Sequence, residues 1–249
     1  MPIPIDELSL FFPCHNEAES LIPLVSEALS ALPALATRYE VIIVDDGSTD
    51  ETPTVAAKLV VAHPAVIRVV RHDDNRGYGA ALRTGFATAT MRRVAFTDGD
   101  CQFRVADLSL LLRAAEESGA PVTVGYRVHR ADPLVRRLYA GLYRVANRVW
   151  FSLQVKDVDC AMKVFDRAVL QDLSISSRGA FFSAELLIKL RAKGVRISEV
   201  GVPHFPRTAG SASGARPRVV VRAIRDFWLL RVSLWLDRDA ALRRGDPLR

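Results

Sequence analysis

The sequence predicts an α/β fold with a mainly parallel central sheet and a C-terminal amphipathic helix. Short apolar runs of strand length alternate with amphipathic stretches of helical length along the chain. Polar segments that carry glycine follow several of these apolar runs. Near the C-terminus, residues 218–237 place most of their arginines on one side of a helical wheel and apolar side chains on the other, which only Arg231 interrupts. In open α/β sheets ligands bind at the carboxyl ends of the strands, so we expect the functional site at that rim.

Four strand and helix units come first. The predicted strands cover 8–12, 39–44, 66–71 and 93–97. A helix over about 17–32 follows the first strand, and one over about 79–90 follows the third. The segment DDGSTDETP after the second strand opens a helix that runs to about Ala62, with Ser48 or Asp50 as its N-cap.

The second half of the chain gives weaker patterns. We predict strands over 122–126, 161–165 and 196–202, and helices over 132–151 and 183–193. The small-residue loop RTAGSASGARP, residues 207–217, is a candidate hinge or lid. We therefore expect one domain over residues 1–210 and a basic amphipathic tail over residues 211–249.

Composition excludes several classes of protein. With 49% hydrophobic and 25% charged residues, the chain is neither disordered nor dependent on a disulfide scaffold. Cys14, Cys101 and Cys160 are odd in number, far apart and without metal-ligand spacing, which favours a reducing, cytosolic setting. The N-terminal segment has no basic region and no long apolar run, so we predict no signal peptide.

The basic tail is the most asymmetric feature of the chain. Nine arginines and four aspartates from Gly210 to Arg249 give +5 of the total charge of +6. One face of the wheel over 218–237 carries Arg218, Arg222, Arg225, Asp226, Ser233 and Asp237. The rest carries Val219, Val220, Ile224, Phe227, Trp228, Leu230, Leu234 and Trp235.

This helix has two interpretations. It lies in a membrane interface, with arginines toward anionic lipid, or it packs on its own domain or on a second subunit. Its uncharged stretches are far shorter than the roughly 20 apolar residues that span a bilayer. A nucleic-acid-binding protein with an Arg-rich tail is a third possibility, but it leaves the strand-end motifs unexplained.

The segment TDGDCQ follows the strand that ends at Thr97. Asp98 and Asp100 can share a hard divalent cation, and Gln102 can add a neutral oxygen, which predicts a site for Mg²⁺ or Mn²⁺. Taken alone, a solvated turn after an edge strand explains the segment as well.

Three further segments follow strand ends in the same way. VDDGSTD places Asp45 and Asp46 where acids accept hydrogen bonds from ribose or base groups, and helix capping by its later residues is compatible with this role. PCHNE, from Pro13 to Glu17, ends the first strand. NRGYGAAL, residues 75–82, is a glycine loop of the kind that approaches phosphates.

These four motifs, in this order, resemble the family 2 glycosyltransferases of the GT-A fold. Within that family the chain is most similar to polyprenyl-phosphate sugar synthases of the dolichol-phosphate mannose synthase type. The resemblance covers about residues 8–213. It continues through VGYR, DVDCAMKVF, FSAELL and EVGVPHFPRTAGSAS.

The resemblance implies a role for each matching residue. The residues that hold the nucleoside of a sugar donor would be Pro13, Glu17, Asp45 and Asp46. The metal on the diphosphate would be held by Asp98, Asp100 and Gln102. Arg127 and Arg207 match arginines that serve phosphate groups, and Asp157 matches a residue near the acceptor. Members of the family invert the configuration at the sugar.

The mechanism depends on whether the acceptor is a phosphate or a hydroxyl. A lipid monophosphate is already a nucleophile and needs only positioning and charge compensation, whereas a hydroxyl needs a general base. Arginines would clamp a phosphate: Arg127, Arg207, and as further candidates Arg136 and Arg137, which a solvated helix face also explains. For a hydroxyl, Asp157 or Asp159 is the candidate base. We interpret His15 and His204 as structural.

The sequence thus predicts an inverting, metal-dependent transfer of a hexose-type sugar from UDP or GDP to a polyprenyl phosphate. The enzyme would be cytoplasmic and peripheral on the inner membrane face, bound through the tail, with a homo-oligomer possible. The alternative is a soluble family 2 glycosyltransferase with a hydroxyl acceptor. Two departures are CAMK at residues 160–163, where relatives carry CGFK, and Tyr78, where several carry Lys.

Overall fold

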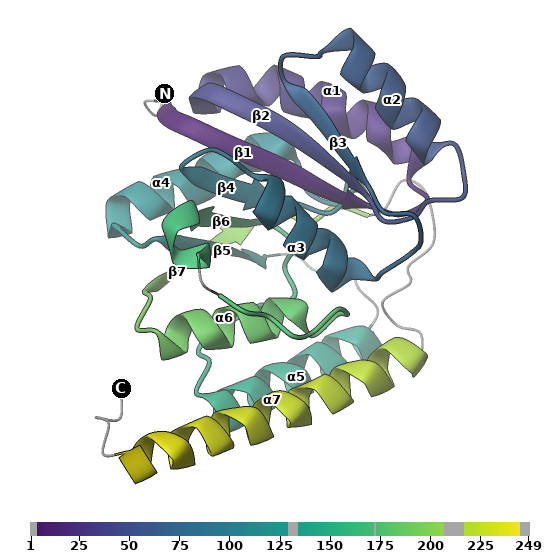
Figure 1. Cartoon of the computed structure of the whole chain (residues 1–249). Helices are drawn as coiled ribbons and strands as arrows, with labels where there is room; N and C mark the ends of the chain where they lie inside the picture. Colours follow the sequence, from purple (N-terminus) through teal and green to yellow (C-terminus); the bar gives the residue numbers. More distant parts are fainter. Residues whose placement is uncertain (1–3, 129–133, 172, 207–216, 245–249) are drawn as a thin grey trace.

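The computed structural model describes residues 4–128, 134–171, 173–206 and 217–244 (Figure 1). Its centre is one seven-stranded sheet in the order β3-β2-β1-β4-β6-β5-β7. The strands are β1 (Ile5–Cys14), β2 (Ala36–Asp45), β3 (Ile67–Arg71), β4 (Arg93–Phe96), β5 (Val122–Arg127), β6 (Lys163–Asp166) and β7 (Ile197–Val202). Only β6 is antiparallel to its described neighbours, β4 and β5. The predicted α/β fold with a mainly parallel sheet is confirmed.

Helices cover both faces of this sheet. They are α1 (Ala18–Leu35), α2 (Thr52–Ala62), α3 (Tyr78–Thr88), α4 (Leu108–Ser118), α5 (Leu134–Phe151), α6 (Phe182–Ala192) and α7 (Pro217–Arg244). Single 3₁₀ turns lie at Val105–Asp107 and Arg167–Leu170. In Figure 1, α1 and α2 lie on one face, α3 and α6 lie on the other, and α5 and α7 form an outer layer beyond α6.

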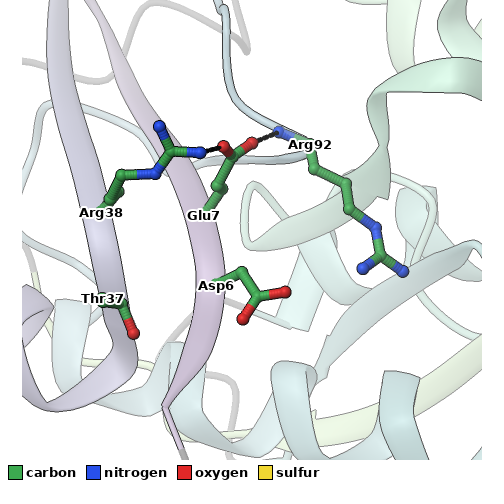
Figure 2. A pocket seen from close by; sticks show the side chains of 5 residues that line it. All are labelled: Asp6, Glu7, Thr37, Arg38 and Arg92. Atoms are coloured by element: carbon green, nitrogen blue, oxygen red, sulfur yellow. Dashed lines mark hydrogen bonds and ion pairs between the residues drawn. The ribbon is translucent and has the colours of Figure 1, made fainter.

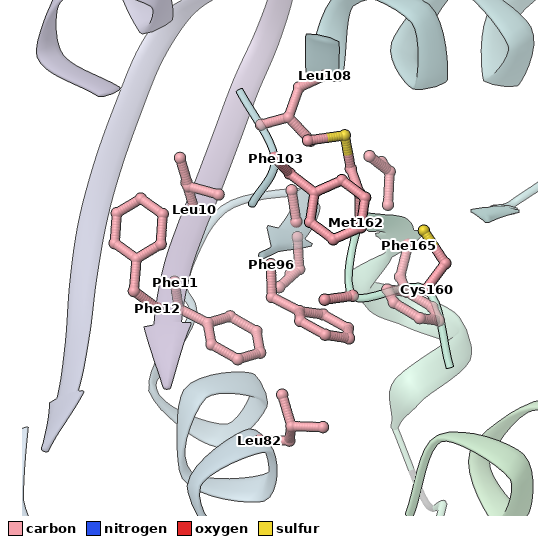
Figure 3. Packing of buried hydrophobic residues seen from close by; sticks show 14 of the residues in the cluster. Leu10, Phe11, Phe12, Leu82, Phe96, Phe103, Leu108, Cys160, Met162 and Phe165 are labelled. Carbon is pink, nitrogen blue, oxygen red and sulfur yellow. The ribbon is translucent and has the colours of Figure 1, made fainter. Parts of the chain in front are cut away.

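A cluster of phenylalanines joins the sheet to the α3 and α6 layer (Figure 3). The ring of Phe11 on β1 lies 5.3 Å from that of Phe96 on β4 and 5.0 Å from that of Phe86 on α3. A Cβ at Gly85 would come within 2.3 Å of the Phe11 ring, so only glycine lets α3 pack this closely. The rigid core therefore fixes the strand ends that carry the motifs.

The helix predictions missed one helix and gave the wrong N-cap for another. The helix α4 was not predicted, although Leu108, Leu111, Leu112 and Ala115 form its buried stripe. The N-cap of α2 is Glu51, not Ser48 or Asp50. The Ser48 hydroxyl instead accepts the backbone N–H of Asn16 at 2.9 Å, and Asp50 accepts the N–H of Thr52 at 2.9 Å. Both side chains thus tie loops together just before the helix begins.

The C-terminal helix packs partly on its own domain. Phe227 and Leu230 are buried in the main hydrophobic cluster, and the Phe227 ring lies 4.8 Å from that of Phe151 on α5. The expected packing on the domain's own surface is therefore present along this stripe. Other apolar side chains of α7 remain exposed, Trp228 and Trp235 among them.

One helix of the described chain, α1, is long and apolar enough to cross a membrane by length and composition. Its apolar side is packed against the sheet, since Leu21, Leu24, Val25, Ala28 and Leu32 are fully buried. We therefore assign α1 to the core of the domain.

Candidate active site

The predicted motifs meet at the carboxyl ends of the central strands. Cys14 at the end of β1 pairs in register with Asp45 at the end of β2, and β4 lies on the other side of β1. The turn after β4 reaches the same point, because a Cβ at Gly99 would lie 3.2 Å from the Pro13 carbonyl oxygen and 3.7 Å from Glu17 Cγ. Segments far apart in the sequence thus form one continuous rim.

Three of the predicted site carboxylates act electrostatically on the thiol of Cys14. Burial raises the pKa of this thiol well above its usual value, and the negative charges of Glu17, Asp45 and Asp98 raise it further. The thiol therefore stays neutral, and it serves as a small buried group at the end of β1. Such a concentration of carboxylates suits a site that binds a cation together with sugar and nucleoside hydroxyls.

The Asp45 side chain is fully buried at the end of β2. Its Oδ1 atom accepts the backbone N–H of Ser48 at 2.9 Å, and its Oδ2 atom lies 3.3 Å from Nε of Arg71. Glu17 is half-buried just before α1, where it accepts a hydrogen bond from Ser20 Oγ at 2.8 Å. Both carboxylates are held in place by their own loops.

The carboxylate of Asp46 organises the glycine loop. It accepts the backbone N–H groups of Arg76 and Gly77, each at 2.9 Å, and the Nδ1–H group of His72 at 2.7 Å. Charge-assisted hydrogen bonds of this kind are short and rigid, so Asp46 fixes the approach of the loop to the rim. Sequence reasoning missed His72, and the signal was its place directly after the third strand.

Asp98 and Asp100 lie in the turn after β4, as predicted. Asp100 is buried, and its Oδ1 atom accepts the backbone N–H of Gln102 at 3.1 Å. The Gln102 side chain donates from Nε2 to the carbonyl oxygen of Phe205 at 3.2 Å, which joins this turn to the segment after β7. All three predicted metal ligands therefore lie in one short turn at the rim.

The donor chemistry of this turn fits a hard divalent cation. Its carboxylate and amide oxygens are the ligands that Mg²⁺ and Mn²⁺ prefer, and a cation held by few protein atoms keeps positions for phosphate oxygens. Among the described residues, no group of three or more His, Cys, Asp or Glu side chains is arranged to hold a metal ion.

Tyr78, at the start of α3, contacts the same turn. Its hydroxyl donates a hydrogen bond to Asp98 Oδ1 at 2.8 Å. Burial raises the pKa of this phenol, and Asp98, Asp159 and Asp100 raise it further. The hydroxyl therefore stays protonated and acts as a donor toward Asp98.

Arg127, at the carboxyl end of β5, forms a buried ion pair with Asp157. The guanidinium Nε and Nη2 atoms lie 2.7 and 2.9 Å from the two oxygens of Asp157. Both side chains are largely buried, at 11% and 5% exposure. The sequence placed both residues near the acceptor, and the structure adds that they are partners, so Asp157 fixes the plane of the guanidinium.

Lys163 is a further cation that sequence reasoning did not assign. Its side chain is fully buried, its Nζ group donates to the carbonyl oxygen of Cys160, and it lies 5.4 Å from the centre of the Phe96 ring. Burial lowers the pKa of Lys163, and the charges of Cys160 and Asp159 act in the opposite direction. The motif CAMK thus places a lysine beneath the acidic rim.

Some predicted residues are not placed. Arg207 and the loop over residues 207–216 lie outside the described residues, and the side chains of Arg136 and Arg137 are not among those described. Both histidines make contacts within the domain. His15 donates to the carbonyl oxygen of Asp46 at 2.8 Å, and the His204 ring lies 5.2 Å from that of Phe103.

A surface hollow of about 480 Å³ lies elsewhere (Figure 2). It is lined by Asp6, Glu7, Thr37, Arg38 and Arg92, where Glu7 binds both the Arg38 side chain and the Arg92 N–H group. These residues are at the amino ends of β1, β2 and β4. The hollow is thus at the edge of the sheet opposite to the motifs, and we do not assign the site to it.

Comparison with known proteins points to one group. The sequence profile described as "Glycosyl transferase family 2" matches residues 9–174. An uncharacterized glycosyltransferase of Mycobacterium tuberculosis is 36% identical over 90% of this chain and 97% of its own length. The dodecaprenyl-phosphate galacturonate synthase of Rhizobium johnstonii is 30% identical over 84% of this chain and 62% of its own length.

A solved structure shares the fold. Glucosyl-3-phosphoglycerate synthase from Mycobacterium tuberculosis, in complex with phosphoglyceric acid, superposes with a TM-score of 0.71 at 19% identity. The match covers 91% of this chain and 80% of that one. A second structure of that enzyme contains Mn²⁺, UDP and glucosyl-3-phosphoglycerate, and its TM-score is 0.67.

Proposed function

The chain belongs to glycosyl transferase family 2, and we propose that it transfers a hexose-type sugar, with inversion, from UDP or GDP to a polyprenyl phosphate. The observation that carries this proposal is one rim with two unlike halves. An acidic half holds Glu17, Asp45, Asp98 and Asp100, and the other half holds the Arg127–Asp157 pair. The first half suits a sugar nucleotide with its cation, and in the second Asp157 fixes the direction of the guanidinium that would contact an acceptor phosphate.

The nucleoside is bound at the ends of β1 and β2. Glu17 and Asp45 would accept hydrogen bonds from its base and ribose, and Pro13 would bound the pocket at the end of β1. Asp46 contributes by holding Arg76 and Gly77, because its oxygens already accept their N–H groups. Because the glycine loop is already ordered before the donor binds, the entropy cost of binding the donor is lower.

The cation is held by Asp98 and Asp100, with Gln102 as a third candidate ligand. When bound, Mg²⁺ or Mn²⁺ stabilises the charge that develops on the departing nucleoside diphosphate. Tyr78 holds one oxygen of Asp98 in a fixed direction, so it would act as a positioning residue for this carboxylate. The solved structure with Mn²⁺ and UDP supports a cation of this kind at a GT-A rim.

Under this proposal the acceptor phosphate is bound by Arg127 and by Arg207. A phosphate monoester is a nucleophile without loss of a proton, so the site needs orientation and positive charge rather than a base. Asp157 is a positioning residue for Arg127 under this proposal. The R. johnstonii relative, whose name specifies a dodecaprenyl phosphate product, supports a lipid phosphate acceptor.

The reaction would take place on the cytoplasmic face of the cell membrane, where polyprenyl phosphates are held. The C-terminal tail, with its excess of arginines, would keep the enzyme at that surface. This placement requires no membrane-spanning segment in the tail.

Comparison of two lipids tests the acceptor chemistry. Purified protein with Mg²⁺ and UDP- or GDP-sugars should release nucleoside diphosphate faster when a short polyprenyl phosphate is added. The matched polyprenol, which lacks the phosphate, should give no increase. An equal increase with polyprenol, or an increase only with soluble saccharides, would replace the proposal with a family 2 glycosyltransferase that uses a hydroxyl acceptor.

A further inference from the structure

The outer faces of α5 and α7 expose a dense group of large apolar side chains. On α5 these are Leu142, Val145, Val149 and Trp150, and on α7 they are Val220, Val221, Ile224, Trp228, Leu229, Val232, Trp235 and Leu236. Each of these twelve side chains is at least 45% exposed. Elsewhere in the described chain, the exposed large hydrophobic residues are only Ile22, Val61 and Val128.

The two groups form one surface. The rings of Trp150 on α5 and Trp228 on α7 lie 5.0 Å apart at their centres, and the Arg231 guanidinium lies 5.9 Å from the centre of the Trp150 ring. Figure 1 shows the two helices side by side in the outer layer. We call the exposed apolar residues of both helices the two-helix apolar face. A continuous apolar surface of this size marks a contact site.

Positive charge borders this face. Arg218, Arg222 and Arg225 are exposed along one edge of the α7 stripe. We propose that the two-helix apolar face docks on the headgroup region of an anionic lipid bilayer, with the tryptophans at the interface and the arginines toward lipid phosphates. The inference deepens the proposed function by adding α5 to the C-terminal helix, and it rests on that function for the choice of a membrane as partner.

Charge complementarity favours lipid over a second copy of the chain. In a two-fold dimer each copy would present the same patch, so the arginine edges of the two copies would add like charge at one interface. An anionic bilayer compensates that charge and covers the apolar side chains at the same time.

The face is also attached firmly to the donor site. Asp226 on α7 accepts a hydrogen bond from Ser177 Oγ at 3.0 Å, and the neighbouring Arg178 carbonyl oxygen accepts the N–H group of Gly79 at 3.0 Å. Gly79 lies in the first turn of α3, two residues after Gly77, whose N–H group Asp46 accepts. Docking through α7 would therefore set the orientation of the rim relative to the membrane.

Vesicle flotation with the full chain tests the inference. Phosphatidylcholine vesicles with about one third phosphatidylglycerol are compared with pure phosphatidylcholine, without donor, metal or polyprenyl lipid. The protein should float with the anionic vesicles only. Val149→Glu on α5 and Trp235→Glu on α7 should each weaken binding about tenfold, since each places a charge where an apolar group is buried. Val61→Glu, at an even more exposed valine on α2, should bind as the unaltered protein does.

The outcomes separate this inference from the proposed function. Binding of Val149→Glu at the unaltered level would remove α5 from the face, and absence of vesicle binding by the unaltered protein would overturn the inference. Light scattering that shows a dimer, broken by Val149→Glu, would assign the face to a second copy instead. Thermal melting checks that each variant folds. Sugar transfer measured in detergent is unaffected by loss of docking, so its failure would count against the proposed function alone.

Discussion

The hydroxyl of Tyr78 donates a 2.8 Å hydrogen bond to Oδ1 of Asp98, across the gap between α3 and the turn after β4. This bond joins the glycine motif to the acidic motif that we propose holds the cation. Because burial and three nearby carboxylates raise the pKa of the phenol, the proton stays on Tyr78 and the negative charge stays on Asp98. The carboxylate is thereby oriented while it remains ionised.

Tyr78→Phe should weaken cation binding without unfolding the protein. Loss of a hydrogen bond to a charged group costs about 1.5–3 kcal/mol, or roughly tenfold or more in affinity. Electron paramagnetic resonance of Mn²⁺, titrated with UDP present, measures this directly. Tyr39→Phe on β2, far from the rim, is the control and should leave the titration unchanged. Equal Mn²⁺ affinity in Tyr78→Phe and the unaltered protein would remove the positioning role.

Variants of the Arg127–Asp157 pair should affect stability and activity differently. Arg127→Met leaves a buried carboxylate without its partner and should lower the free energy of unfolding by about 3–5 kcal/mol. The double variant Arg127→Met/Asp157→Leu should recover most of that stability and still transfer no sugar to a phosphate acceptor. Urea denaturation and the transfer assay measure the two effects. Transfer by the double variant at the unaltered rate would show that the pair is structural only.

Asp100→Asn should abolish cation-dependent turnover while the protein stays folded. The substitution keeps size and hydrogen-bonding capacity but removes the charge that a hard cation requires. Asp73→Asn, at a fully exposed carboxylate in the neighbouring loop, is the matched control and should retain full turnover. Full activity in Asp100→Asn, with circular dichroism unchanged, would contradict the metal assignment.

Gly47→Ala should destabilise the rim more than a left-handed glycine elsewhere does. Gly47 has φ +63°, and a Cβ there would lie 2.2 Å from the backbone carbon of Asp74. The control is Gly194→Ala, where φ is +76° but no atom lies within 4 Å of the added Cβ. The control should lose about 1–2 kcal/mol from backbone conformation alone. Gly47→Ala should lose clearly more unfolding free energy, measured by urea denaturation. Equal losses in the two variants would mean that the backbone at Asp74 moves away from the added Cβ at no cost.

Local pattern predicted the first four strands and their motifs because each strand and its polar end are adjacent in the sequence. The buried runs of β1 and β2 and the turns at Asp46 and Asp98 are local features. The order β4-β6-β5 was not predictable in this way, because β6 joins the sheet between two strands that precede it in the chain. Nor was the Arg127–Asp157 pair, whose members lie thirty residues apart on different segments.

The two helices of the outer layer show a second limit of sequence reasoning. The helical wheel of α7 separated apolar from basic residues. It could not show which of the apolar residues are buried against the domain and which are exposed. In the structure Phe227 and Leu230 face the domain, whereas Trp228 and Trp235 remain exposed. That division depends on where α5 and α6 lie, which is a property of the tertiary packing.

The central claim is transfer of sugar to a lipid phosphate, and one measurement tests it most directly. Protein, Mg²⁺ or Mn²⁺, a panel of radiolabelled UDP- and GDP-sugars and a short polyprenyl phosphate are incubated, and label is counted in the organic phase. We predict label from one donor, lost with EDTA and absent with Asp100→Asn. Nucleotide release into water without label in the organic phase for any donor would contradict the lipid acceptor.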